Sequence, residues 1–294
     1  MSERRFAYLM MTPAALFLLV LVAYPVMLLV YNSFFEVELI DPSRREFLGL
    51  GNYIGIFESS RVQQSALRTL KYTAFALSFE ILLGFTAALL FNSLAEKSKW
   101  HRTIFTLPLM IPPIVAGLLW RFLLAEHIGL VNNVLAAIGI LDSPSDFSWL
   151  SDPDIVLYAV ALPDIWITTS FVALIVYAGL QNIPQDLIEA AKIDGASAIQ
   201  RFWHVVLPLL RPVIAVVLIV RGVDAAKTFD LIWIQTEGGP RFQSEVLSMN
   251  IYQRMVRYGD LGEASASATL FTLVMTVIAI VAYKVIWSPS NDKK

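Results

Sequence analysis

Residues 181–211 read QNIPQDLIEAAKIDGASAIQRFWHVVLPLLR and encode two short helices between two long apolar stretches. Pro184 suits the first turn of a helix, and Gly195 can adopt the left-handed conformation that ends one. Ser197 can cap a second helix, which we expect to stop near Pro208. We call the polar connection over residues 181–212 the hook. Its helices are too short and too polar to cross a membrane.

The second predicted helix of the hook has one apolar stripe. Ile199, Phe202, Trp203 and Val206 fall at positions i, i+3, i+4 and i+7, which lie on one helix face. Two interpretations fit this pattern. The helix could lie flat on a membrane surface, or its stripe could dock into a groove on a cytoplasmic partner.

The sequence on both sides of the hook is strongly apolar. Of the 294 residues, 57% are hydrophobic and 16% are charged, whereas a soluble domain has roughly 25% charged residues. A membrane span needs about 20 mostly apolar residues. Six stretches qualify: Phe6–Tyr31, Leu70–Phe91, Ile104–Leu124, Ile155–Leu180, Val213–Ile234 and Ala264–Trp287. The sequence therefore predicts an all-α integral membrane protein with about six transmembrane helices in a single domain, residues 1–294.

Two of these stretches have features of their own. The first has an apolar core longer than that of a signal peptide and no cleavage site after it, so we expect a retained anchor. The third contains Pro108, Pro112 and Pro113, which should bend or break its helix.

The charges of the loops predict the orientation of the chain. Eleven loop Lys and Arg residues fall on the side of the hook and both termini, and eight fall on the other side. The loop Ala125–Asp154 has five acidic residues and no Lys or Arg. Because cytoplasmic loops are enriched in Lys and Arg, both termini and the hook should face the cytoplasm.

Several kinds of chemistry have no support in the sequence. There is no G-x-x-x-x-G-K-[ST] phosphate loop and no G-x-S-x-G nucleophile motif. The three His residues lack metal-ligand spacing, and Cys is absent. The 22 basic and 24 acidic residues form no basic face for nucleic acid. We therefore predict no catalytic residue, no metal site and no cofactor bound by this chain.

The hook resembles a known motif. Glu189, Ala190 and Ala191 are followed after three residues by Gly195, after nine more by Val205, and then by Leu207 and Pro208. This spacing resembles the "EAA" loop of bacterial ABC-importer permeases, with Val205 in place of isoleucine. Further segments are similar to the carbohydrate-importer branch of that family: Asp194–Ala196, Pro212, Phe47–Leu50, Asn52–Tyr53, Phe229–Asp230 and Thr236 with Gly238–Pro240.

The resemblance implies a function and a set of partners. It points to one permease subunit of a type I, maltose-like or glycerol-phosphate-like importer in a bacterial inner membrane. The implied partners are a second homologous permease, two ATP-binding subunits that use ATP and Mg, an external solute-binding protein and a sugar. The implied ATPase-coupling residues are Glu189, Ala190, Ala191, Asp194, Gly195, Phe202, Leu207 and Pro208. The rival interpretations are a secondary transporter or channel subunit, which leaves the spacing of the hook unexplained, and an intramembrane enzyme.

Polar residues inside the spans are the candidates for substrate contact, because an intramembrane charge is costly and usually functional. Arg221, Asp224, Lys227 and Asp230 recur at i+3 in the fifth span and should share one slowly turning helix face. They are either a structural ladder of ion pairs or part of a sugar site. Sugar sites combine hydrogen-bonding groups with aromatic faces. The candidates are Glu80, Trp120, Asp164, Trp166, Thr168, Thr169, Asp224 and Lys227. Trp120 and Trp166 could instead be interfacial anchors, and the two threonines could bond their own helix.

Overall fold

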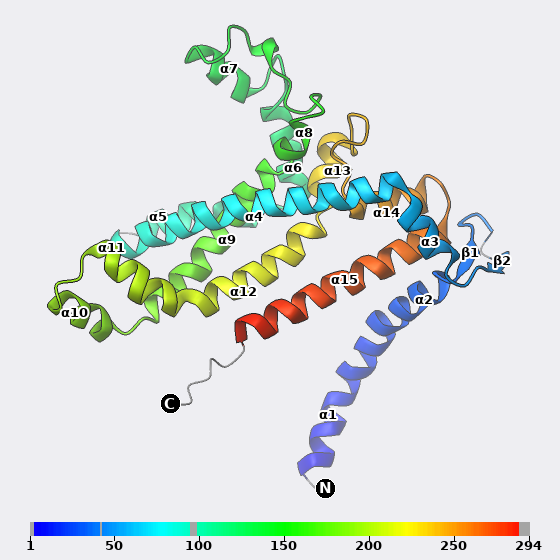
Figure 1. Cartoon of the computed structure of the whole chain (residues 1–294), viewed down its shortest axis with the longest axis horizontal. Helices are drawn as coiled ribbons and strands as arrows, with labels where there is room; N and C mark the ends of the chain where they lie inside the picture. Colours follow the sequence, from blue (N-terminus) through cyan, green and yellow to red (C-terminus); the bar gives the residue numbers. More distant parts are fainter. Residues whose placement is uncertain (1–2, 42, 95–98, 288–294) are drawn as a thin grey trace. The chain divides into compact units, whose positions relative to one another are not determined.

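The computed structural model describes residues 3–41, 43–94 and 99–287, which are mostly helical (Figure 1). The helices are α1 (Glu3–Leu18), α2 (Tyr24–Asn32), α3 (Gly51–Glu58), α4 (Ser60–Leu94), α5 (Lys99–Thr106), α6 (Pro113–Leu123), α7 (Leu130–Ala137), α8 (Val156–Ala159), α9 (Leu162–Gln181), α10 (Gln185–Ile193), α11 (Ala198–Arg201), α12 (Leu207–Ala226), α13 (Asp230–Thr236), α14 (Leu247–Val256) and α15 (Leu261–Trp287). Strands β1 (Phe35–Val37) and β2 (Arg45–Phe47) form a small antiparallel hairpin. The chain divides into two compact units: Met1–Gln64 with Ser248–Thr276, and Ser65–Leu247 with Val277–Lys294.

The prediction of about six transmembrane helices is confirmed. In the described residues, five helical segments are long and apolar enough to cross a membrane: Tyr8–Asn32, Ser60–Leu94, Val156–Gln181, Ala198–Thr236 and Leu261–Lys284. A sixth span is present if the pair Trp100–Met110 and Pro113–Leu123 is one broken span, bent by 96°. The predicted break at the prolines of the third stretch is thus confirmed.

The first unit contains the N-terminal span and the hairpin. The amide of Asn52, on α3, donates hydrogen bonds of 2.9 Å to the carbonyl oxygens of Ser33 and Phe35, which fixes α3 against the start of the hairpin. A β-carbon on Gly262, in α15, would lie 2.3 Å from the same Phe35 oxygen. Only glycine therefore allows α15 to approach the hairpin this closely.

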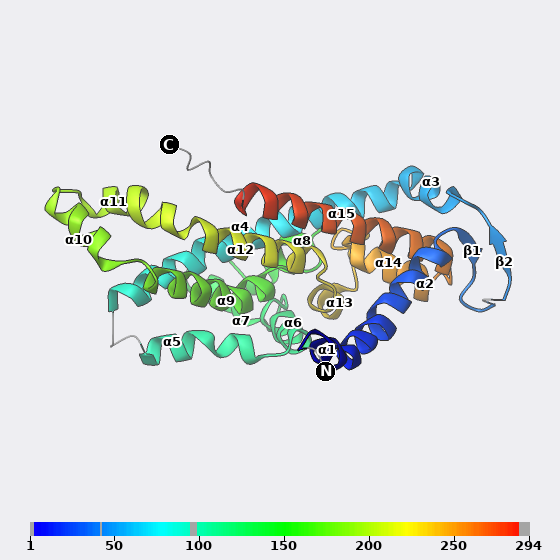
Figure 2. The ribbon, with the colours of Figure 1, turned by 90° about the horizontal axis from the view of Figure 1, so that it is seen from below.

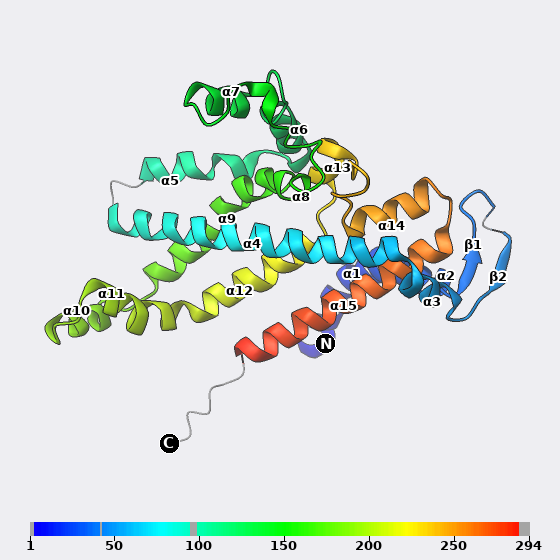
Figure 3. The ribbon, with the colours of Figure 1, turned by 45° about the horizontal axis from the view of Figure 1, so that its top comes forward.

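The core of the second unit lies where α4, α9 and α12 meet. Its buried members are Ala88 from α4, Val172, Val176 and Leu180 from α9, Ile183, and Leu210 and Val217 from α12. Close approach depends on glycine, as is typical of membrane helices. A β-carbon on Gly84 would lie 2.7 Å from Val172, and one on Gly179 would lie 2.9 Å from Leu210. The hook α10–α11 joins α9 to α12 (Figure 2). The hook and α7 lie at opposite ends of this unit (Figure 3).

Two predictions about the helix that follows the hook are wrong. We expected a stop near Pro208, but the helix continues from α11 into α12 through a π-helical turn, Phe202–Val206. There the N–H of Leu207 donates to the oxygen of Phe202, five residues back. A π-helical turn lacks the usual i→i−4 hydrogen bonds. Pro208, which has no backbone N–H, can therefore follow it without breaking the helix.

The second wrong prediction is that the fifth span, Val213–Ile234, is one continuous helix, although the span itself lies within Ala198–Thr236, which can cross a membrane. α12 ends at Ala226, and α13 begins at Asp230. The physical reason is the packing of α13 on α6, where a β-carbon on Gly117 would lie 2.4 Å from Ile234. No Gly or Pro marks this break in the sequence.

Candidate functional site

An ion-pair network lies at the meeting point of α4, α9 and α12. The guanidinium of Arg221 donates two hydrogen bonds of 2.9 Å to the two oxygens of Glu80, and one of 3.1 Å to Asp164. Arg221, Glu80 and Asp164 are 3%, 0% and 4% exposed. The hydroxyl of Tyr72 donates to the other oxygen of Asp164 at 3.1 Å. One cation therefore ties together three helices that are far apart in the sequence.

The network continues toward the exposed side of α12. Arg221 also pairs with Asp224, and the amino group of Lys227 lies 3.2 Å from Asp224. About half of the Asp224 side chain and more than half of the Lys227 side chain are exposed. The predicted common face thus holds for Arg221, Asp224 and Lys227. Asp230 does not share it, because it lies in α13.

The predicted substrate residues differ in whether their side chains are exposed and in what they already bind. Glu80 and Asp164 are covered and paired with Arg221. The hydroxyls of Thr168 and Thr169 donate to backbone oxygens four residues back in their own helix, at 2.6 Å. Asp224 and Lys227 remain accessible, so they are the charged candidates that a passing solute could reach.

Two tryptophans from different helices come together. The rings of Trp120, on α6, and Trp166, on α9, pack edge to face with centroids 6.2 Å apart. Trp166 also packs against a buried cluster formed by Ala116, Ile167 and Leu231. The sequence predicted both residues as sugar contacts but gave no signal that they would pair.

The turn of the hook follows its prediction. Gly195 has φ of +79°, in the left-handed region, and a β-carbon there would meet no atom within 4 Å. Ser197 and Gln200 form a reciprocal capping box at the start of α11. Glu189, Ala190 and Asp194 are exposed, Ala191 is half-buried, and Leu207 and Pro208 are half-buried.

The apolar stripe of the hook does not form one face, so that prediction is wrong. The ring of Phe202 packs edge to face on Phe85 of α4, with centroids 5.8 Å apart, and Val206 packs on the core of the unit. Ile199 and Trp203 are 72% and 59% exposed. The π-turn explains the split, because its hydrogen bonds span five residues rather than four and the α-helical spacing no longer applies. With Ile193, which is 86% exposed, Ile199 and Trp203 form the exposed apolar surface of the hook.

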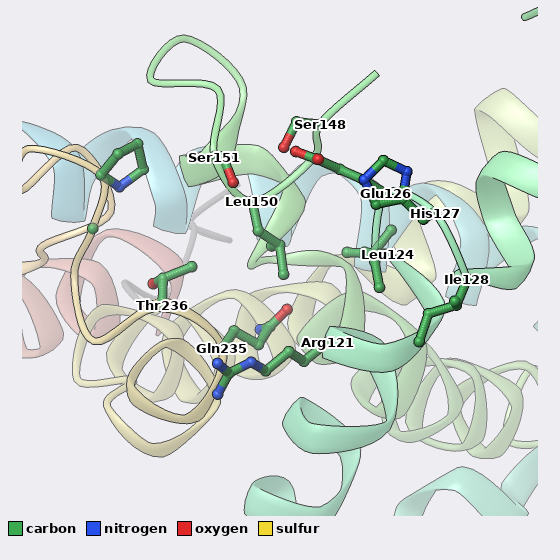
Figure 4. Close-up of a pocket in the computed structure, with 13 residues that line it drawn as sticks. Arg121, Leu124, Glu126, His127, Ile128, Ser148, Leu150, Ser151, Gln235 and Thr236 are labelled. Carbon is green, nitrogen blue, oxygen red and sulfur yellow. The ribbon is translucent and has the colours of Figure 1, made fainter. Parts of the chain in front are cut away.

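A cavity of about 590 Å³ lies at the opposite end of the same unit, beside the loop that was predicted to face outward (Figure 4). Its walls come from the end of α6, residues 125–128, residues 148–151 and the end of α13. The lining residues are Arg121, Leu124, Ala125, Glu126, His127, Ile128, Ser148, Leu150, Ser151, Gln235, Thr236, Gly239 and Pro240. Sequence reasoning missed this cavity because its residues come from separate segments, and only Thr236, Gly239 and Pro240 belonged to a recognised signature.

The walls of the cavity are held by specific packing. The side chain of Asn132, which is fully buried, donates to the oxygens of Pro144 and Phe147 at 2.7 Å. Its own oxygen accepts from the indole N–H of Trp149 at 2.6 Å. These bonds fix the loop that carries one wall, and Gly117 lets α6 and α13 approach closely below it.

Comparison with known proteins establishes the family. Residues 80–287 match the family described as "Binding-protein-dependent transport system inner membrane component", and the chain belongs to that family. It is 37% identical over 282 residues to the sulfoquinovosyl glycerol transport system permease protein of Agrobacterium fabrum, covering 95% of this chain and 90% of the relative. It is 34% identical to the trehalose/maltose transport system permease protein of Thermococcus litoralis, covering 96% and 94%. The trehalose transport system permease protein of Mycobacterium tuberculosis is 32% identical, with 97% and 89% covered.

Solved structures confirm the fold. The chain matches a bacterial ABC transporter involved in the import of alginate, with a TM-score of 0.83, 23% identity and coverage of 97% of this chain and 96% of that chain. It matches an alginate transporter in complex with its pentasaccharide-bound periplasmic protein with a TM-score of 0.82 and 24% identity, covering 97% and 95%. The protein is therefore a multi-pass permease subunit of an ABC importer, with the fold of a type I importer permease, and it is not an enzyme.

The buried network yields a stability prediction. Replacing Arg221 with Met strands two buried carboxylates, so it should lower the free energy of unfolding by about 3–5 kcal/mol. The yield of monodisperse protein and its melting temperature measure this loss. The matched control is Lys227→Met, which breaks a pair that is more than half exposed and should cost at most about 1 kcal/mol. The combined change Glu80→Gln, Asp164→Asn and Arg221→Met should recover part of the loss. If Arg221→Met is as stable as Lys227→Met, the network does not hold the unit together.

Proposed function

We propose that this chain is one of two homologous permease subunits that import a sugar or sugar derivative, together with two ATP-binding subunits and an external solute-binding protein. The relatives named above are permeases for trehalose, maltose and sulfoquinovosyl glycerol. The observation that carries the coupling role is the exposed apolar surface of the hook, Ile193, Ile199 and Trp203, on a polar loop between two spans. Such a surface suits a groove on a cytoplasmic partner.

The mechanism we propose is alternating access driven by the ATP-binding subunits. A push on the hook passes into α12 without an interruption, because the π-turn joins α11 to α12 as one helical rod. Arg221 then couples α12 to α4 and α9 through Glu80 and Asp164. These three helices would move as one body and open the pathway to one side at a time. ATP and Mg would be bound by the partner subunits and not by this chain.

The accessible polar residues support a sugar pathway lined by Asp224 and Lys227, with Trp120 and Trp166 as aromatic contacts. The positive charge of Arg221 does not argue for an anionic sugar. The two carboxylates of Glu80 and Asp164 already more than offset it, and the guanidinium is covered. The exposed pair of Asp224 and Lys227 is neutral as a whole and offers both acceptors and donors to hydroxyl groups.

The orientation we propose follows the loop charges: both termini and the hook in the cytoplasm of a bacterium, and residues 125–154 outside. On α7, Leu130 and Val134 are exposed at i and i+4, and Ile138 continues that face just after the helix. This apolar surface lies in an acidic loop without Lys or Arg. It supports docking of the external solute-binding protein at this end of the unit.

The import function is tested by reconstitution. Vesicles that contain both permeases and both ATP-binding subunits should accumulate labelled trehalose, maltose or sulfoquinovosyl glycerol only when ATP and the binding protein are present. A secondary transporter would accumulate sugar without the ATP-binding subunits. Uptake of none of the three solutes under full conditions would contradict the sugar assignment.

The orientation is tested with single cysteines, because the native chain has none. A membrane-impermeant thiol reagent should label Ser145→Cys, in the predicted external loop, in spheroplasts with intact inner membranes. It should label Ser197→Cys, in the hook, only after the membrane is opened. The reverse pattern would refute the proposed orientation.

The coupling role is tested at the hook. Trp203→Ala removes an exposed aromatic side chain and should lower the affinity for the ATP-binding subunit by about tenfold or more, the loss typical of an interface aromatic, while the melting temperature is unchanged. Phe202→Ala should instead lower the melting temperature, because it removes the contact with Phe85.

A second pair of variants separates backbone strain from coupling. Gly195→Asp places a β-carbon at φ of +79° and should uncouple ATP hydrolysis from import. Gly139→Asp imposes similar strain at φ of +76° in the external loop and should leave coupling intact. Native ATPase binding and import in both Trp203→Ala and Gly195→Asp would refute the coupling role of the hook.

A further inference from the structure

The outer cavity has the size and composition of a small-molecule site. Its volume of about 590 Å³ falls within the roughly 300–1,000 Å³ of such sites. Its polar groups include donors and acceptors from separate segments: Arg121 on α6, Glu126 and His127 in the next loop, and Ser148 and Ser151 in the segment before α8 (Figure 4). Leu124, Ile128 and Leu150 supply apolar contacts between these groups.

One buried side chain is oriented toward this cavity with an unused acceptor. Gln235 is 3% exposed, and its amide nitrogen donates to the oxygens of Leu231 at 2.9 Å and Val160 at 3.2 Å. These two bonds fix the side chain, and its oxygen points toward the cavity (Figure 4). That oxygen has no hydrogen-bond partner among the described residues. A buried acceptor without a partner costs about 1–3 kcal/mol, so it suggests that a ligand or solvent group satisfies it.

A second unused polar atom lies one helical turn further along α6. Trp120 precedes Leu124 by four residues, so the two side chains lie on the same face of the helix. The indole nitrogen of Trp120 is buried and has no partner in the described part of the chain. On α13, Leu231 precedes Gln235 by the same four residues and belongs to the cluster that Trp166 adjoins. The pair of Trp120 and Trp166 therefore lies about one helical turn from the cavity, along both α6 and α13. We call this pair the Trp120–Trp166 layer.

The unused acceptor of Gln235 and the N–H donors of Arg121 line one cavity, and they fit a ligand with hydroxyl groups, because each hydroxyl both donates and accepts. Arg121 and Glu126 have opposite charges, so the cavity selects for neither sign. Arg121 is itself positioned by a hydrogen bond of 3.1 Å from one guanidinium nitrogen to the oxygen of Ile234. No other hydrogen bond of its side chain is present among the described residues, so its remaining N–H groups can bind a ligand.

We propose that this cavity is an outer carbohydrate subsite, which binds an uncharged mono- or disaccharide between its release outside and its passage to the Trp120–Trp166 layer. The subsite is distinct from the accessible pair of Asp224 and Lys227. It rests on the proposed function as a sugar permease. Gln235 binds a hydroxyl group, Arg121 and Glu126 orient the ring, and Leu124 and Leu150 contact its C–H surface.

The test is protection of a cysteine in the cavity by sugar. The assembled importer, carrying Ser151→Cys as the single cysteine of this chain, is placed in nanodiscs without the binding protein and treated with a small water-soluble thiol reagent. Any native cysteines of the partner subunits are removed. Saturating trehalose should slow modification of Ser151→Cys at least fivefold. Ser145→Cys, which is exposed in the same loop but does not line the cavity, is the matched control and should be modified at the same rate with and without trehalose.

Two second-site changes test the proposed contacts. Glu126→Gln keeps the size of the side chain and removes its charge. It should raise the trehalose concentration that gives half protection by about two- to tenfold, as expected for one weakened hydrogen bond. Arg121→Met should raise it by at least as much. The melting temperature of each variant shows whether the fold is retained, and Glu126→Gln alone tests the contacts if Arg121→Met is unstable.

The outcomes separate this proposal from the proposed function. Import of trehalose in the reconstituted system without protection of Ser151→Cys would overturn the subsite and leave the import function intact. Equal protection of Ser145→Cys would also overturn the subsite. Protection of Ser151→Cys only when the binding protein is added would overturn it as well, because it would show that the cavity is a protein-docking surface. Protection by sulfoquinovosyl glycerol but not by trehalose would overturn the preference for an uncharged sugar. Absence of import of trehalose, maltose and sulfoquinovosyl glycerol alike would contradict the proposed function itself.

Discussion

The arrangement of the second unit depends on a guanidinium that is buried within the membrane-spanning helices. An unpaired charge in hydrocarbon costs several kcal/mol, so Arg221 of α12 requires partners wherever it is placed. It finds them in Glu80 of α4 and Asp164 of α9, with hydrogen bonds of 2.9 and 3.1 Å. This requirement fixes how far each helix slides along the others. The apolar contacts of Val172 and Leu210, and the close approaches at Gly84 and Gly179, are consistent with that one alignment.

The helix α12, which Arg221 holds in this alignment, also joins the two ends of the unit. At one end, the π-turn over Phe202–Val206 keeps α11 and α12 continuous despite Pro208, and it turns Phe202 inward while Trp203 stays exposed. A force applied to the exposed side of the hook therefore reaches Arg221 through a single rod. A break at Pro208 would have separated the coupling surface from the ion-pair network, and the hook would then move independently of the spans.

At the other end, the constraints are hydrogen bonds and close backbone packing rather than ion pairs. Asn132 holds the loop around α7 through carbonyl groups and the indole of Trp149, and Gly117 allows α13 to lie against α6. These contacts build the walls of a cavity lined by Arg121, Glu126 and Gln235. The short helix α13 is central, because it begins only after α12 has ended and so changes direction toward α6. Because α12 ends at Ala226, the unit has one helix that carries Arg221 and a separate helix, α13, that forms a wall of the outer cavity.

The sequence by itself determined the features that depend on neighbours along the chain. Hydropathy marked the spans, the prolines marked the bend of the third, and Gly195 and Ser197 marked the turn and cap of the hook, because each of these follows from local backbone chemistry. The fixed spacing from Glu189 to Pro208 indicated the family because it resembles a known motif. Tertiary structure alone decided that Arg221 pairs with Glu80, 141 residues away, that α12 ends at Ala226, and which side of the hook is covered. Helical periodicity places residues on a face but does not say what packs against that face, since burial and charge pairing are set by segments distant in the sequence.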